Sequence, residues 1–407
     1  MKNSWMNRYI VGACMALLLV CCKKDADTIA PPPVQVLPGV LNMLDSINQF
    51  SLFRYALTKA NLDTAIDPRG NYTVFAIDNA AMNTAGFTTA GIDRLSIDSL
   101  QKLFSYHIAI GGFPDSVLAG SANYVGAQTI RQDISFTPSA GYRTYRQYLY
   151  IMLQGGKLVV NTQIANNGER ALQAGNGLIY GVNRLFSAPV KSLYATIQAR
   201  PELSYYFYAL RIIDSLYNSV RTATSTFPKV LDSPFLASVG IDFQVLNALG
   251  TSGKSLQSLP TVLAPVNDAF VKFGLNSLND IKNYCLKRPT SDIRLSKYIG
   301  LDSVLKNHIV FSPLDQYYNF IFYDQFLQNP GINNKTHNVS YYSRIISTSF
   351  PIGTNAYLQF SVVGGTVQMV PSGNTGMVPA QILNTARDIL TTNGIIHEVD
   401  RIMPPKP

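Results

Sequence analysis

The sequence has few of the residues from which covalent cross-links and metal centres are built. It contains only four cysteines and four histidines in 407 residues. Three of the cysteines lie within the first 22 residues, so Cys285 stands alone in the remainder and an intrachain disulfide is not expected there. The patterns HExxH and CxxC are missing, as are histidine pairs at ligand spacing. We therefore expect a fold held together by packing alone, with no metal and no cofactor.

Signatures of common enzymes are missing as well. No GxSxG sequence marks a serine nucleophile, and the glycine pairs at 155–156 and 364–365 are too short for a phosphate-binding loop. Cys285 does not stand in the sequence context of a catalytic cysteine. We therefore expect that the protein is not an enzyme, and an uncharacterised hydrolase is the weakest of the alternatives.

No hydrophobic run near the N-terminus is long enough to cross a bilayer. After Lys2 and Arg8, the apolar stretch covers only residues 10–21, whereas a spanning helix needs about 20 residues. The stretch ends in LVCC, which resembles the lipobox of bacterial lipoproteins. The resemblance implies a signal peptide at residues 1–21 and lipidation of Cys22. A plain secretory signal and an uncleaved anchor are the alternatives.

Residues 22–37 are charged at first and then rich in proline, without helical or strand periodicity, which predicts a flexible tether. The Lys-Lys-Asp that follows Cys22 resembles the start of many Bacteroidota lipoproteins. Each buried methylene of an acyl chain contributes about 0.8 kcal/mol, so a lipidated cysteine would stay on the membrane. We expect an outer-membrane lipoprotein of the cell envelope, displayed at the cell surface, for which nucleic acid is not an expected partner.

The main feature of the remaining sequence is an internal repeat. A hydrophobic fraction of 47% and a charged fraction of 14% are typical of a globular chain, and domains of about 150 residues would give two or three. The same landmarks occur twice in the same order. They are Tyr-Ala-Leu (55–57, 208–210), an apolar strand (73–76, 261–264), an amphipathic segment ending in histidine (107, 308), a Gly-Gly hairpin (155–156, 364–365) and an Asn-Gly strand (176–179, 393–396). The repeat predicts two domains of one fold, at residues 38–190 and 191–407, the second enlarged by insertions.

The repeated segments resemble a known family. TVFAIDNAAM (73–82) and TVLAPVNDAF (261–270) are similar to the first signature of fasciclin-type domains, approximately TVFAPTNEAF. FSYHIAIG (104–111) resembles the Tyr-His element of that family, and NGIIHEVDRIMPP (393–405) resembles its closing motif. The resemblance to the fasciclin and beta-Ig-H3 family covers nearly the whole mature chain. It implies an α+β fold of two tandem fasciclin-like domains, each a compact β-sandwich or wedge with several packed α-helices.

The motif residues are expected to be structural. A strand that gives way to a helix within two residues needs a side-chain cap, so Asp78-Asn79 and Asn267-Asp268 are predicted to cap the helices that follow them. Three histidines lie at apolar-face positions and are expected to be buried and bonded to the backbone, whereas His337 lies in a polar loop. The residues given structural roles are Thr73, Asn79, Tyr106, His107, Asn176, Gly177, Thr261, Asn267, His308, Asn393, Gly394, His397 and Asp400.

The two copies depart from the family pattern at different places. The first has Tyr180 and Asn183 where the closing motif has His and Asp, and the second has Asn307 in place of the tyrosine of Tyr-His. These departures weaken any adhesive function carried over through the Tyr-His region.

Two groups of residues could form a ligand surface. Clustered tyrosines can stack on sugars or anchor a protein partner, and a basic insert can meet acidic polysaccharide or lipid headgroups. Half-buried sheet residues and a solvated loop are the alternatives. The residues are Tyr142, Tyr145, Tyr317, Tyr318, Tyr323, Arg288 and Arg294.

The leading interpretation is a non-catalytic, lipid-anchored cell-envelope protein that mediates adhesion or protein–protein contacts. The alternative is a glycan-binding accessory of an outer-membrane polysaccharide uptake system. Membrane contact through the lipid and a surface protein or glycan ligand are therefore the expected partners.

Overall fold

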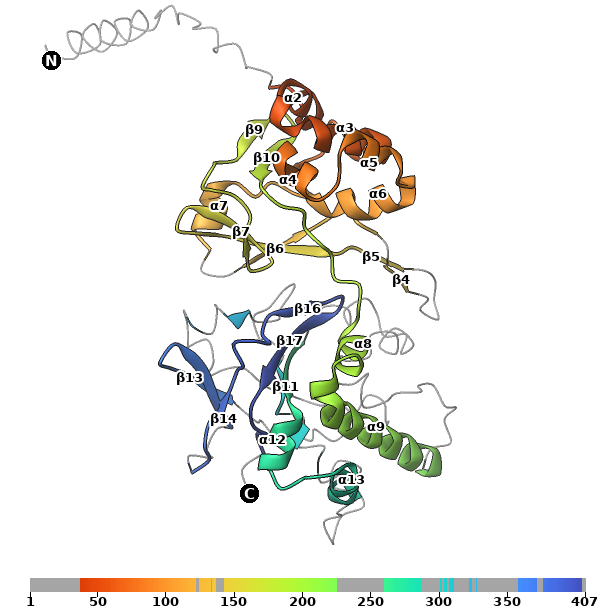
Figure 1. The fold of residues 1–407 in the computed structure, drawn as a ribbon, viewed down its shortest axis with the longest axis vertical. Coiled ribbons are helices and arrows are strands. Elements are labelled where there is room, and N and C mark those ends of the chain that lie inside the picture. The colour runs from red at the N-terminus through yellow and green to blue at the C-terminus, as the bar shows by residue number, and fades with distance from the viewer. Residues whose placement is uncertain are drawn as a thin grey trace, which may run out of the picture. The chain divides into compact units, whose positions relative to one another are not determined.

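Figure 1 shows the fold in a computed structural model of the chain. The structure describes residues 37–121, 124–132, 134–136, 143–224, 260–286, 358–371 and 376–404, together with 301, 304–305, 307–310, 322–323 and 327. The expected signal segment, Cys22 and the tether up to residue 36 lie outside these residues. Helices and several sheets occur in both halves, so the α+β prediction is confirmed.

The first domain is built on a four-stranded sheet of order β2-β1-β10-β9. Its two central strands, β1 (Tyr72–Ile77) and β10 (Gly177–Val182), run parallel, and β2 (Ile108–Ile110) and β9 (Leu172–Ala174) flank them antiparallel. Every residue of β1 after Tyr72 is buried. A strand covered on both faces needs a continuous apolar run, which explains the sequence of this strand.

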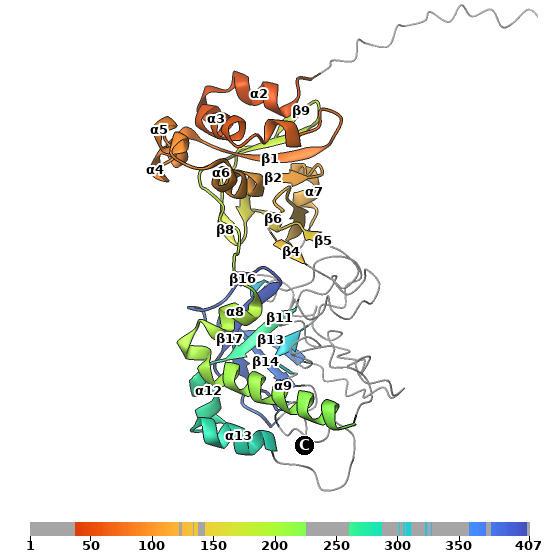
Figure 2. The ribbon, with the colours of Figure 1, turned by 90° about the vertical axis from the view of Figure 1, so that its right-hand side faces the viewer.

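Short helices with polar caps cover this sheet. Asp78, Thr88 and Ser96 each accept a hydrogen bond from the backbone of the helix that they begin, which stabilises these short elements. Helix α3 contacts α4, α5 and α6 (Figure 2). The helices are α2 (Val40–Ser46), α3 (Ser51–Lys59), α4 (Asn79–Thr84), α5 (Thr89–Asp93), α6 (Ile97–Phe104) and α7 (Asp115–Ala119), with 3-10 turns η1 (Asn48–Phe50), η2 (Asp63–Ala65) and η3 (Ser105–His107).

A second sheet of order β3-β6-β7-β8 completes the first domain. Its strands are β3 (Val125–Gln128), β6 (Tyr148–Gln154), β7 (Lys157–Val160) and β8 (Gln163–Ile164), and β4 (Ile134–Phe136) pairs with β5 (Arg143–Tyr145) in a separate ribbon. The predicted hairpin lies between β6 and β7. Gly155 and Gly156 both have positive φ, +57° and +78°, which suits the tight turn that joins twisted strands.

The second domain repeats the first sheet with the same topology. The order is β12-β11-β17-β16, and β11 (Thr261–Pro265) and β17 (Gly394–Val399) form the central parallel pair between β12 (Ile309–Val310) and β16 (Ile389–Thr391). An antiparallel sheet of β13 (Leu358–Val363), β14 (Thr366–Pro371) and β15 (Ala380–Gln381) corresponds to β6, β7 and β8. The two tandem domains predicted from the repeat thus share one fold.

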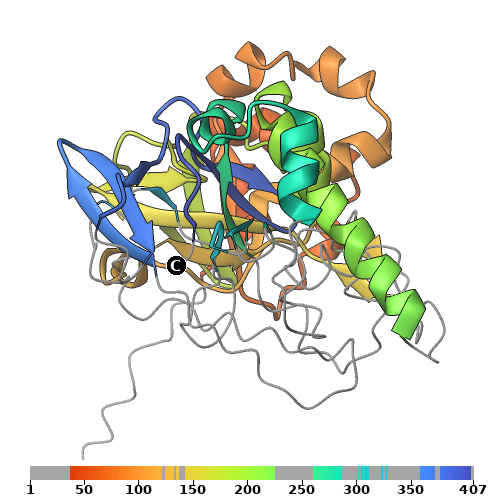
Figure 3. The same ribbon diagram turned by 90° about the horizontal axis from the view of Figure 1, so that it is seen from below.

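In the second domain, as in the first, one helix contacts several others. Helix α9 contacts α8, α12 and α13 (Figure 3). Each domain has its own apolar core, the first including Phe53, Phe75 and Phe104 and the second including Phe270 and Ile281. The helices are α8 (Leu193–Gln198), α9 (Ser204–Thr224), α12 (Asn267–Lys272) and α13 (Leu278–Leu286), with η4 (Pro201–Leu203).

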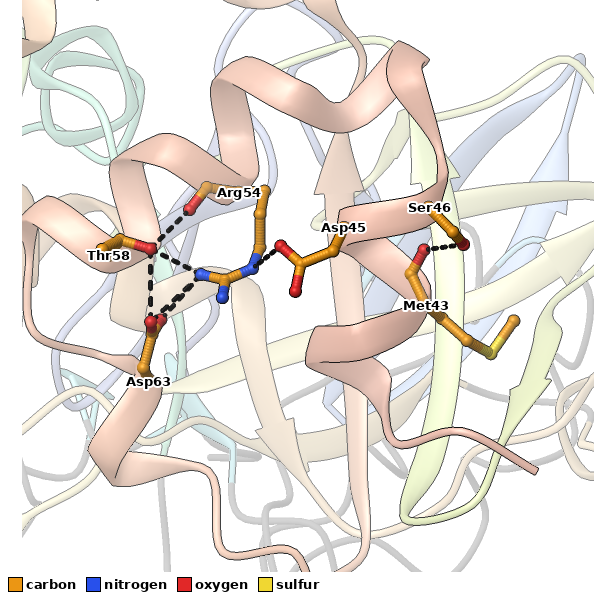
Figure 4. Close-up of polar contacts among 6 residues, drawn as sticks. All are labelled: Met43, Asp45, Ser46, Arg54, Thr58 and Asp63. Atoms are coloured by element: carbon orange, nitrogen blue, oxygen red, sulfur yellow. Dashed lines mark hydrogen bonds and ion pairs between the residues drawn. The ribbon is translucent and has the colours of Figure 1, made fainter. Parts of the chain in front are cut away.

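A charge cluster ties three helical elements of the first domain together. The guanidinium of Arg54 on α3 contacts Asp45 of α2 at 2.8 Å and Asp63 of η2 at 3.0 Å, and Thr58 joins the same cluster (Figure 4). The Arg54 side chain is only 18% exposed, so solvent screens these contacts less than it screens ordinary surface ion pairs. Arg54 therefore fixes the orientation of α2 relative to α3.

Of the helices in the described ranges, none has both the length and the apolar character needed to span a bilayer.

Candidate functional site

His107 lies in the core of the first domain and joins two backbone segments. Its Nδ1 is 3.2 Å from the carbonyl oxygen of Phe75 in β1, and the backbone N–H of Phe186, beyond β10, donates to Nε2 at 3.0 Å. Since a carbonyl can only accept, Nδ1 carries the proton and the ring is neutral. The ring also stacks on Phe186, with centroids 4.6 Å apart. His107 thus fastens the chain leaving the last strand to the first strand.

His308 makes the same contacts in the second domain. Its Nδ1 is 2.8 Å from the carbonyl oxygen of Leu263 in β11, and the backbone N–H of Met403 donates to Nε2 at 2.9 Å. Burial lowers the pKa of His107 to about 3 and that of His308 to about 4. Both imidazoles are fully enclosed, so this arrangement supports the scaffold and offers no proton to a ligand in solvent.

The motif residue Asn79 caps a neighbouring helix and not its own. Helix α4 is capped by Asp78, whose Oδ1 accepts from the backbone N–H of Ala81 at 2.7 Å. The side-chain oxygen of Asn79 instead accepts from the backbone N–H of Leu52 in the first turn of α3 at 3.0 Å. Its amide donates to the carbonyl oxygen of Asn48 at 2.8 Å. Of the predicted capping pair, only Asp78 caps the helix that follows.

In the second domain the predicted cap is wrong. Helix α12 begins after Val266 without a side-chain cap. Asn267 Oδ1 accepts from the backbone N–H of Tyr205 in the first turn of α9 at 2.9 Å, and its amide donates to the carbonyl oxygen of Pro201 at 3.0 Å. The physical reason is that both asparagines are the first residues of their helices, where the side chain points toward the neighbouring helix.

Replacing Asn79 with alanine is expected to destabilise the first domain by about 1–3 kcal/mol. The change removes one helix cap and one of the two donors to the Asn48 carbonyl, which also accepts from the backbone N–H of Ser51. Urea unfolding followed by circular dichroism measures the loss. Asn79→Asp keeps the acceptor for Leu52 and should lose less. An alanine variant as stable as the parent would contradict the capping role.

The Asn-Gly motifs join the last strand of each domain to its first helix. Asn176 Oδ1 accepts from the backbone N–H of Val40, the first residue of α2, at 2.8 Å. Asn393 Oδ1 accepts equally from Leu193, the first residue of α8, at 2.8 Å. These bonds satisfy N–H groups that a helix cannot pair internally. The glycines that follow, Gly177 and Gly394, allow a neighbouring backbone carbonyl to approach closely.

Tyr106 is buried in the first domain, and the second domain differs at this position. The Tyr106 hydroxyl donates to the carbonyl oxygen of Tyr148 at 2.9 Å and accepts from the Asn161 amide at 3.0 Å. In its place, Asn307 donates to the carbonyl oxygen of Met403 at 2.9 Å. The enclosed Asn307 Oδ1 has no hydrogen-bond partner within the described residues. The Tyr-His element of the first domain therefore belongs to the core, and Tyr106 is not exposed at the surface of the domain.

The remaining motif residues also make backbone contacts. Thr73 Oγ1 donates to the carbonyl oxygen of Gly111 at 2.8 Å, and Thr261 is equally buried. His397 is buried on β17, and its Nδ1 accepts from the backbone N–H of Asp388 at 3.2 Å. Asp400 Oδ1 accepts from the backbone N–H of Gln381 in β15 at 2.7 Å.

Sequence reasoning missed a buried ion pair in the second domain. The Nε of Arg200, just before η4, donates to Glu398 of β17 at 2.6 Å. Glu398 is only 3% exposed, and its burial raises the pKa of this carboxyl. Glu398 lies in the fully buried strand β17. It is 198 residues away from Arg200, so the sequence does not indicate their contact.

The prediction that Tyr323 belongs to a ligand surface is wrong. Tyr323 is fully buried, its hydroxyl donates to the carbonyl oxygen of Gly365 at 3.1 Å, and the Arg387 guanidinium lies 3.8 Å from its ring centre. It packs in a core and offers no ligand surface. Tyr145 lies on β5, but its side chain is outside the described part of the chain. The residues that lie wholly outside it are Tyr142, Tyr317, Tyr318, Arg288 and Arg294.

In the part of the chain that the structure describes, no three His, Cys, Asp or Glu side chains come together in a way that could hold a metal ion. Cys285 is buried on α13.

Comparison with known protein families finds a similarity in the first domain. The family model named "Fasciclin domain" matches residues 48–188, which extend from η1 to beyond β10. Among solved structures, the chain is similar to a FAS1 domain pair from the insect cell adhesion molecule fasciclin I, with 11% sequence identity and a TM-score of 0.29. That match covers 89% of this chain and 95% of the other. No curated protein sequence matches the chain. Fasciclin domains are associated with cell adhesion and protein–protein interaction, and they occur in extracellular or surface proteins.

Proposed function

We propose that the chain is a lipid-anchored protein of the cell envelope whose two fasciclin-like domains mediate adhesion or protein–protein contacts without catalysing a reaction. The family match of the first domain supports this function. The second domain repeats the sheet order and the histidine and asparagine contacts of the first, so we extend the proposal to it, with boundaries at residues 38–190 and 191–407.

The observation that carries the proposal is that the recurring residues of both domains are used inside the scaffold. His107, His308, Asn176 and Asn393 are all buried and bonded to backbone groups. A catalytic group needs access to its substrate. A repeated scaffold whose shared polar residues face inward suits a protein that presents its surfaces to partners.

Glycan binding is the weaker candidate. Of the tyrosines predicted to form a ligand surface, only Tyr323 has a side chain within the described residues, and it lies in a core. We therefore favour contacts with other envelope proteins.

The anchor and the contacts can be tested together on intact cells of the native host. Wild-type protein should fractionate with the outer membrane and form cross-links to other envelope proteins when a membrane-impermeant lysine reagent is used. Cys22→Ser should release the protein from the membrane, because the acyl chains supply the membrane affinity, and its cross-links should disappear.

Lys157→Gln is the matched control, because this exposed lysine lies on the β6–β7 hairpin, far in sequence from the anchor. It should leave fractionation unchanged. A Cys22→Ser protein that stays in the membrane fraction would refute lipidation. A wild-type protein with no cross-linked partner would refute the contact function.

A further inference from the structure

The first domain contains a pocket of about 260 Å³ at the carboxyl ends of its two central strands. Asp78 follows β1, Asn183 follows β10, and both line the pocket. The crevice outside the carboxyl ends of parallel strands is a common place for ligands. The volume lies just below the range of drug-sized sites, about 300–1,000 Å³, so it suits one side chain of a partner. We call it the strand-end pocket and define it by Gln49, Phe50, Asp78, Glu169, Gly181 and Asn183.

The short turns that precede the Tyr-Ala-Leu helices match between the two domains. Turn η1 leads into α3 as η4 leads into α9, and the residues just before the turns are Ile47 and Arg200. Their backbones are nearly the same, with φ of −111° and ψ of 97° for Ile47 and φ of −104° and ψ of 110° for Arg200. The first domain therefore has an isoleucine where the second has an arginine. By the same spacing, Gln49 corresponds to Glu202.

The last strands of the two domains also match residue by residue. Gly181 pairs with Ala76 in the first domain as Glu398 pairs with Ala264 in the second, so Gly181 corresponds to Glu398. An added Cβ at Gly181 would lie only 3.0 Å from the ring of Phe50. The first domain therefore cannot place an acidic side chain at this position without displacing Phe50.

In the second domain, the corresponding place holds a guanidinium group. Arg200 Nη2 lies 2.6 Å from a carboxylate oxygen of Glu202 and 2.6 Å from one of Glu398. The first-domain counterparts of these two acids, Gln49 and Gly181, both line the strand-end pocket. The second domain thus places its own arginine where the first domain has an open pocket.

The strand-end pocket receives its carboxylates from other positions. Asp78 uses Oδ1 to cap α4, and its second oxygen has no hydrogen bond within the described residues. Glu169 Oε2 accepts from the backbone N–H of Asn167 at 2.8 Å. The backbone N–H groups of Glu169 itself and of Asn167 hold the pKa of the Glu169 carboxyl below its ordinary value. Both acids are therefore available to a cation at neutral pH.

Amide groups and one cation complete the polar lining. The side chains of Gln49 and Asn183 are exposed and make no hydrogen bond within the described residues, so their oxygens can accept from a ligand. Asn166 is buried, and its amide already bonds to backbone groups. Arg170 is exposed and is the one cation of the lining, so the two carboxylates leave a net negative charge.

The remaining lining favours a cation with an aliphatic stem over a sugar. Phe50 is the one aromatic residue of the pocket, and at 1% exposure it offers no ring face for stacking. Leu172 is 40% exposed and can contact methylene groups. A neutral ligand that covers Asp78 would remove water from the carboxylate without neutralising it, whereas a guanidinium both neutralises it and donates hydrogen bonds.

We propose that the strand-end pocket binds an arginine side chain of a protein partner. The guanidinium lies between the carboxylates of Asp78 and Glu169, donates to the amide oxygens of Gln49 and Asn183, and has its methylenes against Leu172. This inference rests on the proposed contact function and names the chemistry of the partner. It assigns the contact to the first domain, because the second domain fills the same place with Arg200.

The test uses the mature full chain with ¹³C-labelled leucine and valine methyl groups. The probe is N-acetyl-arginine amide, added to millimolar concentration, and the matched probe is N-acetyl-citrulline amide, which has the same shape without the charge. We expect the arginine probe to shift the methyl signals of Leu172 and Val182, which line the pocket. The signal of Leu95, which is exposed outside the pocket, should not move. The citrulline probe should bind at least about tenfold more weakly, because the charge-assisted bonds are lost.

Charge variants separate the pocket from the rest of the surface. Asp78→Asn/Glu169→Gln should weaken binding of the arginine probe at least about tenfold. It keeps the oxygens that accept from Ala81 and Asn167, so the fold should persist. Asp67→Asn/Asp98→Asn removes the same charge at exposed positions outside the pocket and should bind normally. Arg170→Gln removes the opposing cation and should strengthen binding about two- to fivefold, which damage to the fold could not do.

A further variant gives the first domain the arginine of the second. Ile47→Arg should occupy the strand-end pocket from within and prevent the probe from shifting Leu172. Normal probe binding by this variant would overturn the proposal. Equal shifts with the arginine and citrulline probes, or shifts with methyl glycosides and none with the arginine probe, would overturn it as well. Cross-links on cells that persist in Asp78→Asn/Glu169→Gln would also overturn it, while the proposed contact function would stand.

Discussion

Replacing Gly177 with alanine is expected to unfold the first domain. Gly177 has φ of +151°, and a Cβ added there would lie 2.0 Å from the carbonyl oxygen of Tyr72. These two residues are partners at the start of the parallel pair β1–β10. Strand β1 cannot move away, because it is buried along its length. The expected loss exceeds about 4 kcal/mol, which places it among the most severe substitutions. Thermal unfolding followed by circular dichroism should show one domain missing.

Gly155→Ala is the control for positive φ without a clash. Gly155 has φ of +57° in the β6–β7 turn, and no atom lies within 4 Å of an added Cβ. Its loss should be about 1 kcal/mol, which is the strain of the left-handed backbone alone. Gly394→Ala should repeat the severe effect in the second domain, since the new Cβ would lie 2.5 Å from the carbonyl oxygen of Pro260. Similar losses for Gly177→Ala and Gly155→Ala would contradict the close-approach argument.

Acidification from pH 7 to pH 5 is expected to weaken each domain by about 2 kcal/mol through its buried histidine. The pKa is about 3 for His107 and about 4 for His308 in the folded chain, against an ordinary value of 6.5. Since the folded pKa values are lower, protonation favours the unfolded state. The stability contribution is full above pH 6.5 and is lost as the pH falls toward the folded pKa values. Protonation would also remove the acceptor for Phe186 and Met403.

Glutamine variants isolate the histidine contribution. His107→Gln and His308→Gln keep an amide donor and an oxygen acceptor but do not titrate. Urea unfolding at pH 7, 6 and 5 should show that each variant loses less stability on acidification than the parent, even if it is less stable at pH 7. The other titrating groups are the same in the variant and in the parent, so their contribution cancels in the comparison. A variant with the same pH dependence as the parent would disprove the assignment.

The sequence allowed the fold to be predicted because its landmarks are local. An apolar run such as β1, the Gly-Gly turn and the capping Asp78 act on adjacent residues, and their pattern repeats in order along the chain. The burial expected for His107 and His308 followed from their positions on apolar faces. The same local logic failed for Asn267, because its partner Tyr205 is distant in the sequence and only packing brings α9 to α12.

The candidate site could not be predicted, for a related reason. Tyr323 was expected at a surface because aromatic residues cluster in that stretch, but clustering does not distinguish a core face from an exposed one. Arg200 and Glu398 are likewise joined only by the fold.

The parallel pairing at the centre of each domain also governs when the chain can fold. Strand β1 pairs with β10, which follows it by about a hundred residues. Strand β11 likewise pairs with the distant strand β17. The last strand of each domain is therefore needed to complete its central sheet. While a domain is still emerging from the ribosome or a translocation channel, its first strand has no parallel partner. The chain therefore stays unfolded and can pass through the channel. Export of an unfolded polypeptide is thus compatible with this topology, and a domain cut short before its final strand would become a substrate for proteases.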